Sequence, residues 1–71
     1  MVETTMTMKI RQHITEELAT ANREDLLACR IFIRTCREVD FISREQKIAL
    51  LEFADKTFHE NKAKLKGRAT A

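Results

Sequence analysis

The chain has 71 residues, the length of one small domain, and 34 % of them are charged. It has no proline and a single glycine, which excludes glycine-rich phosphate loops and disfavours β-hairpins, and its net charge of +2 does not by itself indicate nucleic-acid binding. We therefore expect an all-α fold of three helices, with residues 1–71 forming one domain whose ends, 1–6 and 67–71, are disordered.

The first helix is predicted over residues 7–21. Met6, Ile10, Ile14 and Leu18 recur every four residues, which gives a single narrow apolar stripe. The opposite side carries polar residues, so we expect an amphipathic surface helix.

The second helix is predicted over residues 23–38, with Asn22 as N-cap and Asp25 in the first turn, where a carboxylate is favourable. A second apolar side, with Leu27 and Ile31, accompanies its main apolar face. The main face is formed by Leu26, Ala28, Cys29, Phe32, Ile33, Cys36 and Val39. A helix that is apolar nearly all round is buried, and two neighbouring helices can hardly cover so much surface.

This excess of apolar surface predicts a helical homodimer. A domain of this size is marginally stable alone, and oligomerisation is one of the natural remedies. The interface is expected to use large apolar side chains of the second and third helices: Leu27, Ile31, Phe32, Phe53 and Phe58.

Phe41 and Ile42, in the connection that follows, are expected to fold back into the core. Ser43 and Gln46 then match the S-x-x-Q capping box, which predicts a third helix over residues 44–66 that ends at Gly67 as the C′ residue. Its length of roughly 35 Å exceeds that of the other two helices. The end of this helix should therefore project beyond the bundle or pair with the same helix of another subunit. It carries a heptad-like seam: Leu51, Ala54, Phe58, Asn61 and Leu65.

Few residues could form a catalytic or metal-binding site. Cys29 and Cys36 lie seven apart, about 10 Å along one helix, which is too far for a disulfide or a shared zinc ion. They are expected either to pack as small apolar side chains or to meet across a subunit interface. His13 and His59 have no organised partners. We therefore expect no enzyme, no cofactor and no metal.

Two basic stretches allow two interpretations each. Four arginines of the second helix fall within about 60° of its circumference at ~100° per residue, and three lysines lie near the end of the third helix. The arginines either contact phosphates or an acidic protein patch, or are simply the solvated side of the helix. The lysines either bind nucleic acid or an anionic membrane surface, or only complement the helix dipole and keep the surface soluble. The candidate contacts are Arg23, Arg30, Arg34, Arg37, Arg44, Lys62, Lys64 and Lys66.

An alternative function is that of a small helix-turn-helix-like DNA-binding regulator. The second and third helices are joined by a short turn, and Arg44, Gln46 and Lys47 open the third helix, where they would face base edges. Arg30 and Arg34, or the basic residues near the end of the chain, would then contact phosphates. Against this alternative, the turn lacks glycine, contains bulky side chains and precedes an unusually long helix.

Segments 8–17 and 43–66 resemble the small accessory proteins of lambdoid bacteriophages, which are short, charged, helical products of the early region between the exonuclease and excisionase genes. The resemblance implies a non-enzymatic regulatory or adaptor protein that influences the lysis–lysogeny choice or the host cell cycle through contacts with host proteins. No signal-peptide pattern opens the chain and no apolar run is long enough to span a bilayer. We therefore expect a cytoplasmic protein that does not enter the membrane.

Overall fold

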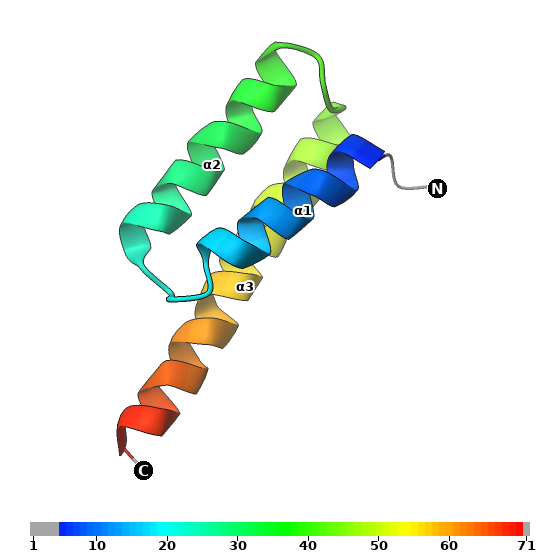
Figure 1. The fold of residues 1–71 in the computed structure, drawn as a ribbon. Helices are drawn as coiled ribbons and strands as arrows, with labels where there is room; N and C mark the ends of the chain where they lie inside the picture. Colours follow the sequence, from blue (N-terminus) through cyan, green and yellow to red (C-terminus); the bar gives the residue numbers. More distant parts are fainter. Residues whose placement is uncertain (1–4, 71) are drawn as a thin grey trace.

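The computed structural model describes residues 5–70, with side chains up to residue 67, and contains three α-helices joined by short connections (Figure 1). Helix α1 spans Thr5–Glu17, α2 spans Arg23–Glu38 and α3 spans Arg44–Thr70. The predicted all-α class is confirmed, and α2 has the predicted bounds.

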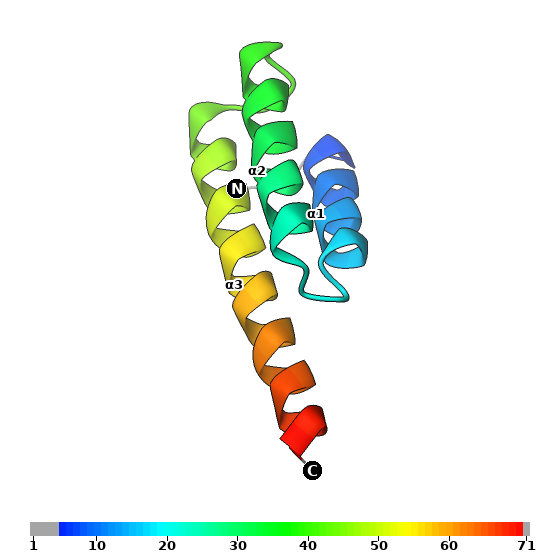
Figure 2. The same cartoon turned by 90° about the vertical axis from the view of Figure 1, so that its left-hand side faces the viewer.

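The three helices pack side by side, with α2 antiparallel to α1 and α3 (Figures 1 and 2). Each helix contacts both others, and α2 packs more extensively on α3 than on α1. The predicted apolar faces are confirmed in part: Phe32 and Val39 of the main face of α2 and Leu65 of the α3 seam are exposed, whereas Leu50 is buried. The residues that form the core recur three or four positions apart on each helix. These core residues are Ile10, Ile14, Leu18, Leu26, Cys29, Ile33, Cys36, Ile42, Leu50, Ala54 and Phe58.

The α1–α2 connection begins earlier than predicted. Helix α1 starts at Thr5 and ends at Glu17 instead of Ala21. Ala21 has a φ of +53°, and this left-handed residue turns the chain so that the Asn22 side chain accepts a 2.8 Å hydrogen bond from the Glu24 amide. The predicted N-cap is thus confirmed.

Helix α2 ends in a Schellman motif without glycine. Asp40 adopts a left-handed φ of +61°, its amide donates to the Arg37 carbonyl, and the Phe41 amide donates to the Cys36 carbonyl. This turn leaves Phe41 61 % exposed while Ile42 is buried. The expectation that both side chains enter the core is therefore wrong for Phe41.

Helix α3 begins with the predicted capping box. The Ser43 amide donates to Gln46 Oε1 at 2.8 Å, and the Gln46 amide donates to Ser43 Oγ at 3.1 Å. The other end differs from the prediction, because the helix continues through Gly67 to Thr70 and Gly67 has no left-handed φ. No neighbouring segment forces the chain to turn there, since a side chain at Gly67 would meet nothing within 4 Å.

The ends predicted to be disordered are helical where the structure describes them. Residues 5 and 6 belong to α1 and residues 67–70 to α3, whereas residues 1–4 and 71 lie outside the described residues. Asn61, the polar member of the predicted seam, donates from Nδ2 to the Leu18 carbonyl at 2.9 Å, where α1 ends. Beyond Asn61, α3 projects from the bundle (Figures 1 and 2), and residues 62–67 are exposed.

Candidate functional site

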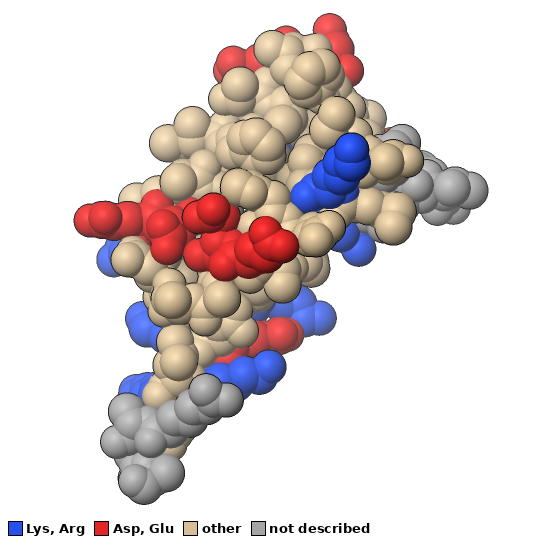
Figure 3. Space-filling model, in the orientation of Figure 1, with Lys and Arg blue, Asp and Glu red and all other residues tan. Residues whose placement is uncertain are grey.

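Helix α2 presents a broad uncharged surface that α1 and α3 do not cover. We call this surface the α2 face. It spans roughly 140° of the helix at ~100° per residue and consists of Leu27, Ala28, Ile31, Phe32 and Thr35, all of them exposed. Leu27 and Ile31, one turn apart, are 51 % and 63 % exposed. In Figure 3, a wide area of uncharged residues lies between the acidic groups at the top of the picture and those at its left.

The predicted interface residues separate into two groups. Leu27, Ile31 and Phe32 lie together on the α2 face, with the Phe32 ring 5.3 Å from the His13 ring of α1. Phe53 is half-buried against the core. Phe58 is buried in the core of the protomer itself, so it is not available to a second subunit.

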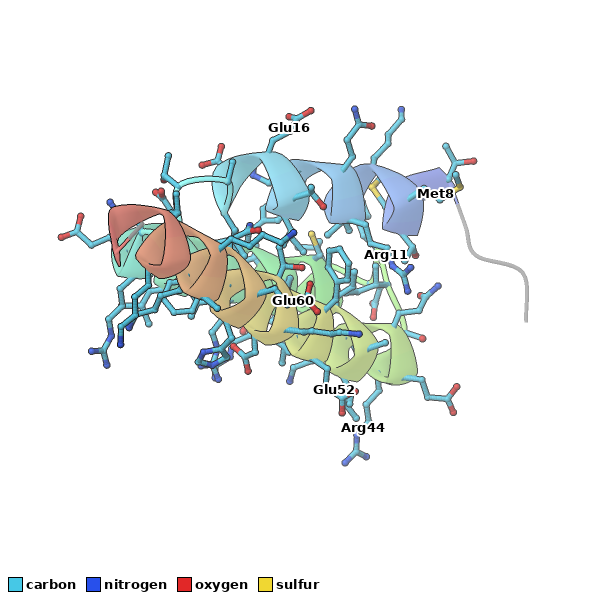
Figure 4. The ribbon with its side chains drawn as sticks, turned by 90° about the horizontal axis from the view of Figure 1, so that it is seen from below. Met8, Arg11, Glu16, Arg44, Glu52 and Glu60 are labelled. Carbon is cyan, nitrogen blue, oxygen red and sulfur yellow. The ribbon has the colours of Figure 1, made fainter. Side chains whose placement is uncertain are left out.

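Phe53 is covered from within its own chain. The Arg11 guanidinium lies 5.3 Å from the centroid of the Phe53 ring, a distance typical of a cation–π contact. In Figure 4, Arg11 points from α1 toward α3, whereas Glu16 points away into solvent. Phe53 therefore belongs to the α1–α3 contact, whereas Leu27 and Ile31 of the α2 face remain exposed.

The arginines of α2 have different surroundings in the folded chain. Arg37 Nη1 lies 2.9 Å from the Asp40 carboxylate, and Arg30 Nη1 lies 4.0 Å from Asp55 of α3. Arg34 remains exposed on the outer side. Because exposed ion pairs contribute little stability, these contacts position the arginines more than they strengthen the fold.

The residues expected to read DNA are not presented together. Gln46 Oε1 is occupied by the capping box, and Gln46 Nε2 donates to the Thr7 hydroxyl oxygen at 3.1 Å. Lys47 is half-buried, whereas Arg44 points away from the bundle (Figure 4). Gln46 therefore joins α3 to α1, and its amide is not free for base contacts.

A pocket of about 360 Å³ lies where α2 begins beside α3. Its lining combines apolar and cationic residues that are far apart in the sequence: Ala21, Arg23, Leu26, Phe58, His59 and Lys62. The fold thus brings two predicted anion contacts, Arg23 and Lys62, to one pocket and adds His59, which the sequence left isolated. Periodicity could not have indicated this pocket, because it depends on how α2 packs against α3. Lys64 and Lys66 are exposed on the projecting part of α3.

Both cysteines are buried and unpaired, which confirms that they pack as apolar side chains. Burial raises the pKa of each thiol above the ordinary value of 9.0, and the Glu17 and Asp25 carboxylates raise the pKa of Cys29 further. Burial also leaves neither thiol accessible to a partner subunit in the folded protomer.

We expect both thiols to react with Ellman's reagent at least about ten-fold more slowly in the folded chain than in denaturant, because the thiolate is the nucleophile. A raised pKa in the folded state means that the unfolded chain releases the thiol protons first. The free energy of unfolding should therefore fall as the pH rises above about 9. Replacing Cys29 and Cys36 with alanine should remove this part of the pH dependence. Equal reaction rates in the folded and unfolded chains would contradict the assignment.

Within residues 5–67, no three His, Cys, Asp or Glu side chains lie close enough to hold a metal ion. Among the described residues, no helix is long and apolar enough to cross a membrane. Comparison with protein-family models, with curated proteins and with solved structures finds no match to the chain.

Proposed function

We propose that this chain is a non-enzymatic regulatory or adaptor protein that acts through protein–protein contacts, and that two copies associate through the α2 face. The observation that supports this proposal is the exposure of Leu27 and Ile31, at 51 % and 63 %, on a helix whose opposite side already forms the core. Contiguous exposed apolar surface on a small protein marks an interaction site.

The composition of the α2 face supports self-association more than contact with a charged partner. Its five residues carry no charge, and homodimer interfaces are more apolar than transient ones. A two-fold interface uses the same patch on both subunits, so the five uncharged residues bring no like charges together at its centre. The exposed Glu24 and Glu38 lie in the same sector of α2, at the two ends of the helix. Association would also add buried apolar surface to a domain that has a small core.

The resemblance to accessory proteins of lambdoid phages suggests the setting. We propose a phage-encoded protein in the host cytoplasm that influences the lysis–lysogeny choice or the host cell cycle by binding a host regulatory protein. The helical fold and the uncovered α2 face agree with a role that needs no catalytic centre.

The test is sedimentation of the wild-type chain and of Leu27→Asp and Ile31→Asp variants at micromolar concentration. We expect the wild-type chain to dimerise and each variant to weaken dimerisation by at least about thirty-fold, since a charge at an interface hot spot costs about 2 kcal/mol or more. Both side chains are exposed, so the helical circular-dichroism signal should remain.

Ile48→Asp is the matched control, because Ile48 is also apolar and 49 % exposed but lies on α3. It should leave the dimer intact. A wild-type chain that stays monomeric and fully folded at these concentrations would contradict the proposal.

A further inference from the structure

The pocket between the start of α2 and the middle of α3 has an apolar floor and a cationic rim. Leu26 and Phe58 are buried and Ala21 is half-buried, whereas Arg23 and Lys62 are exposed. The rim residues come from the start of α2 and from α3, which lie side by side there (Figure 2).

The contacts within the pocket place Lys62 and His59 beside the Phe58 ring. Lys62 Nζ lies 5.8 Å from the centroid of the Phe58 ring, and the exposed His59 ring packs edge-on against the same ring at 5.5 Å. None of the lining residues is acidic. An occupant that places a carboxylate beside Arg23 and Lys62 would therefore meet positive charge without a competing acid from the lining.

We propose that this pocket binds a short acidic peptide segment of a partner protein, with one apolar side chain over Leu26 and Phe58 and carboxylates against Arg23 and Lys62. Charge complementarity selects the acidic segment, and the apolar floor selects a side chain such as leucine. Guanidinium and ammonium groups form charge-assisted hydrogen bonds with carboxylates, which gives the site its polar recognition.

A peptide fits these features better than a nucleic acid. Binding of single-stranded nucleic acid uses several aromatic rings on which successive bases stack, but Phe58 is the single phenyl ring of the pocket lining. The pocket also holds its cations in one small cluster, whereas a nucleic-acid backbone needs a track of phosphate contacts. A phosphate ligand would use Arg23 and Lys62 but leave the apolar floor uncovered.

This inference deepens the proposed role in protein–protein contacts and rests on it, but it does not depend on self-association. Arg23 and Leu26 face α3, whereas Leu27 and Ile31 lie on the α2 face. The two surfaces can therefore be altered separately.

The test measures the fluorescence anisotropy of a short fluorescein-labelled peptide composed of Glu, Leu and Ala, titrated with the full chain. Arg23→Glu and Lys62→Glu should each weaken binding by about three- to ten-fold, the range for loss of a partly exposed charge-assisted contact. Each has a matched control with the same change in charge. Arg44→Glu alters the first residue of α3 as Arg23→Glu alters that of α2, and Lys64→Glu lies two residues from Lys62.

The proposal is supported if the two control variants bind the peptide as tightly as the wild-type chain does. It is also supported if addition of the peptide changes the amide chemical shifts of Ala21 and His59. The proposal is overturned if all four variants lose affinity equally, because that would indicate general electrostatic attraction. Equal binding of a peptide with Lys in place of Glu, or tighter binding of a mixed-sequence single-stranded DNA with the same variant dependence, would also overturn it. Sedimentation of the same variants reports self-association separately, so failure of one proposal leaves the other measurable.

Discussion

Ile33→Ala should remove a large share of the free energy of unfolding. Ile33 is fully buried at the centre of α2, with 0 % exposure. Truncating a buried isoleucine to alanine costs about 2 to 5 kcal/mol through lost burial and the cavity left behind. A chain of this length has roughly 4 to 11 kcal/mol of total stability at ~0.05–0.15 kcal/mol per residue. Urea denaturation followed by circular dichroism measures the loss.

Ile31→Ala is the matched control, because it makes the same change two residues away on the same helix. Ile31 is 63 % exposed, so the protomer loses little buried surface. We expect this variant to change the stability of the protomer by less than about 1 kcal/mol while weakening self-association. Equal destabilisation by the two variants would mean that the inner and outer sides of α2 are wrongly assigned.

Gln46→Ala should destabilise the fold although the residue is polar and lies at the start of a helix. The Gln46 side chain accepts from the Ser43 amide at 2.8 Å and donates to the Thr7 hydroxyl oxygen at 3.1 Å. Losing half of a capping box and one partly buried hydrogen bond costs about 1 to 3 kcal/mol in total. Thermal unfolding should show a lower midpoint and earlier loss of the α1–α3 contact.

Gln12→Ala provides the comparison for this prediction. Gln12 is exposed on α1, and its side-chain amide donates a long 3.4 Å hydrogen bond to the Glu16 carboxylate. Alanine also has the highest helix propensity, so this variant should be neutral or slightly stabilising. If the two variants unfold at the same temperature, the capping box and the Thr7 contact contribute nothing to the fold.

The exposed apolar surface of α2 is energetically unfavourable for a single protomer in water. A three-helix bundle buries one side of each helix, and α2 uses Leu26, Cys29 and Ile33 for that purpose. Leu27 and Ile31 then remain in water at a cost of about 25 cal/mol per Å² of apolar surface that could be buried. This cost is the physical reason to expect a partner, and it does not depend on which process the protein serves.

Local signals in the sequence determined most of the helical framework. The starts of α2 and α3 could be predicted from Asn22, Ser43 and Gln46, because the side chains of these residues accept hydrogen bonds from backbone amides within a few residues. The apolar spacing identified the buried residues of α1 and part of those of α2 and α3, since it depends only on the helical repeat. It did not separate Phe32 and Leu65, which are exposed, from their buried neighbours. The end of α3 was wrongly predicted, because Gly67 permits a left-handed turn but does not require one.

Only the tertiary structure decided which apolar residues are covered and which cations meet. Phe58 and Phe32 are the same residue type, but the packing of α3 buries the first while the second stays on the outer side of α2. Arg23 and Lys62 are 39 residues apart, and they share a pocket because α2 runs antiparallel to α3. Helix periodicity fixes the side of a helix on which a residue lies, whereas the contacts of that side depend on distances between helices that no local pattern encodes.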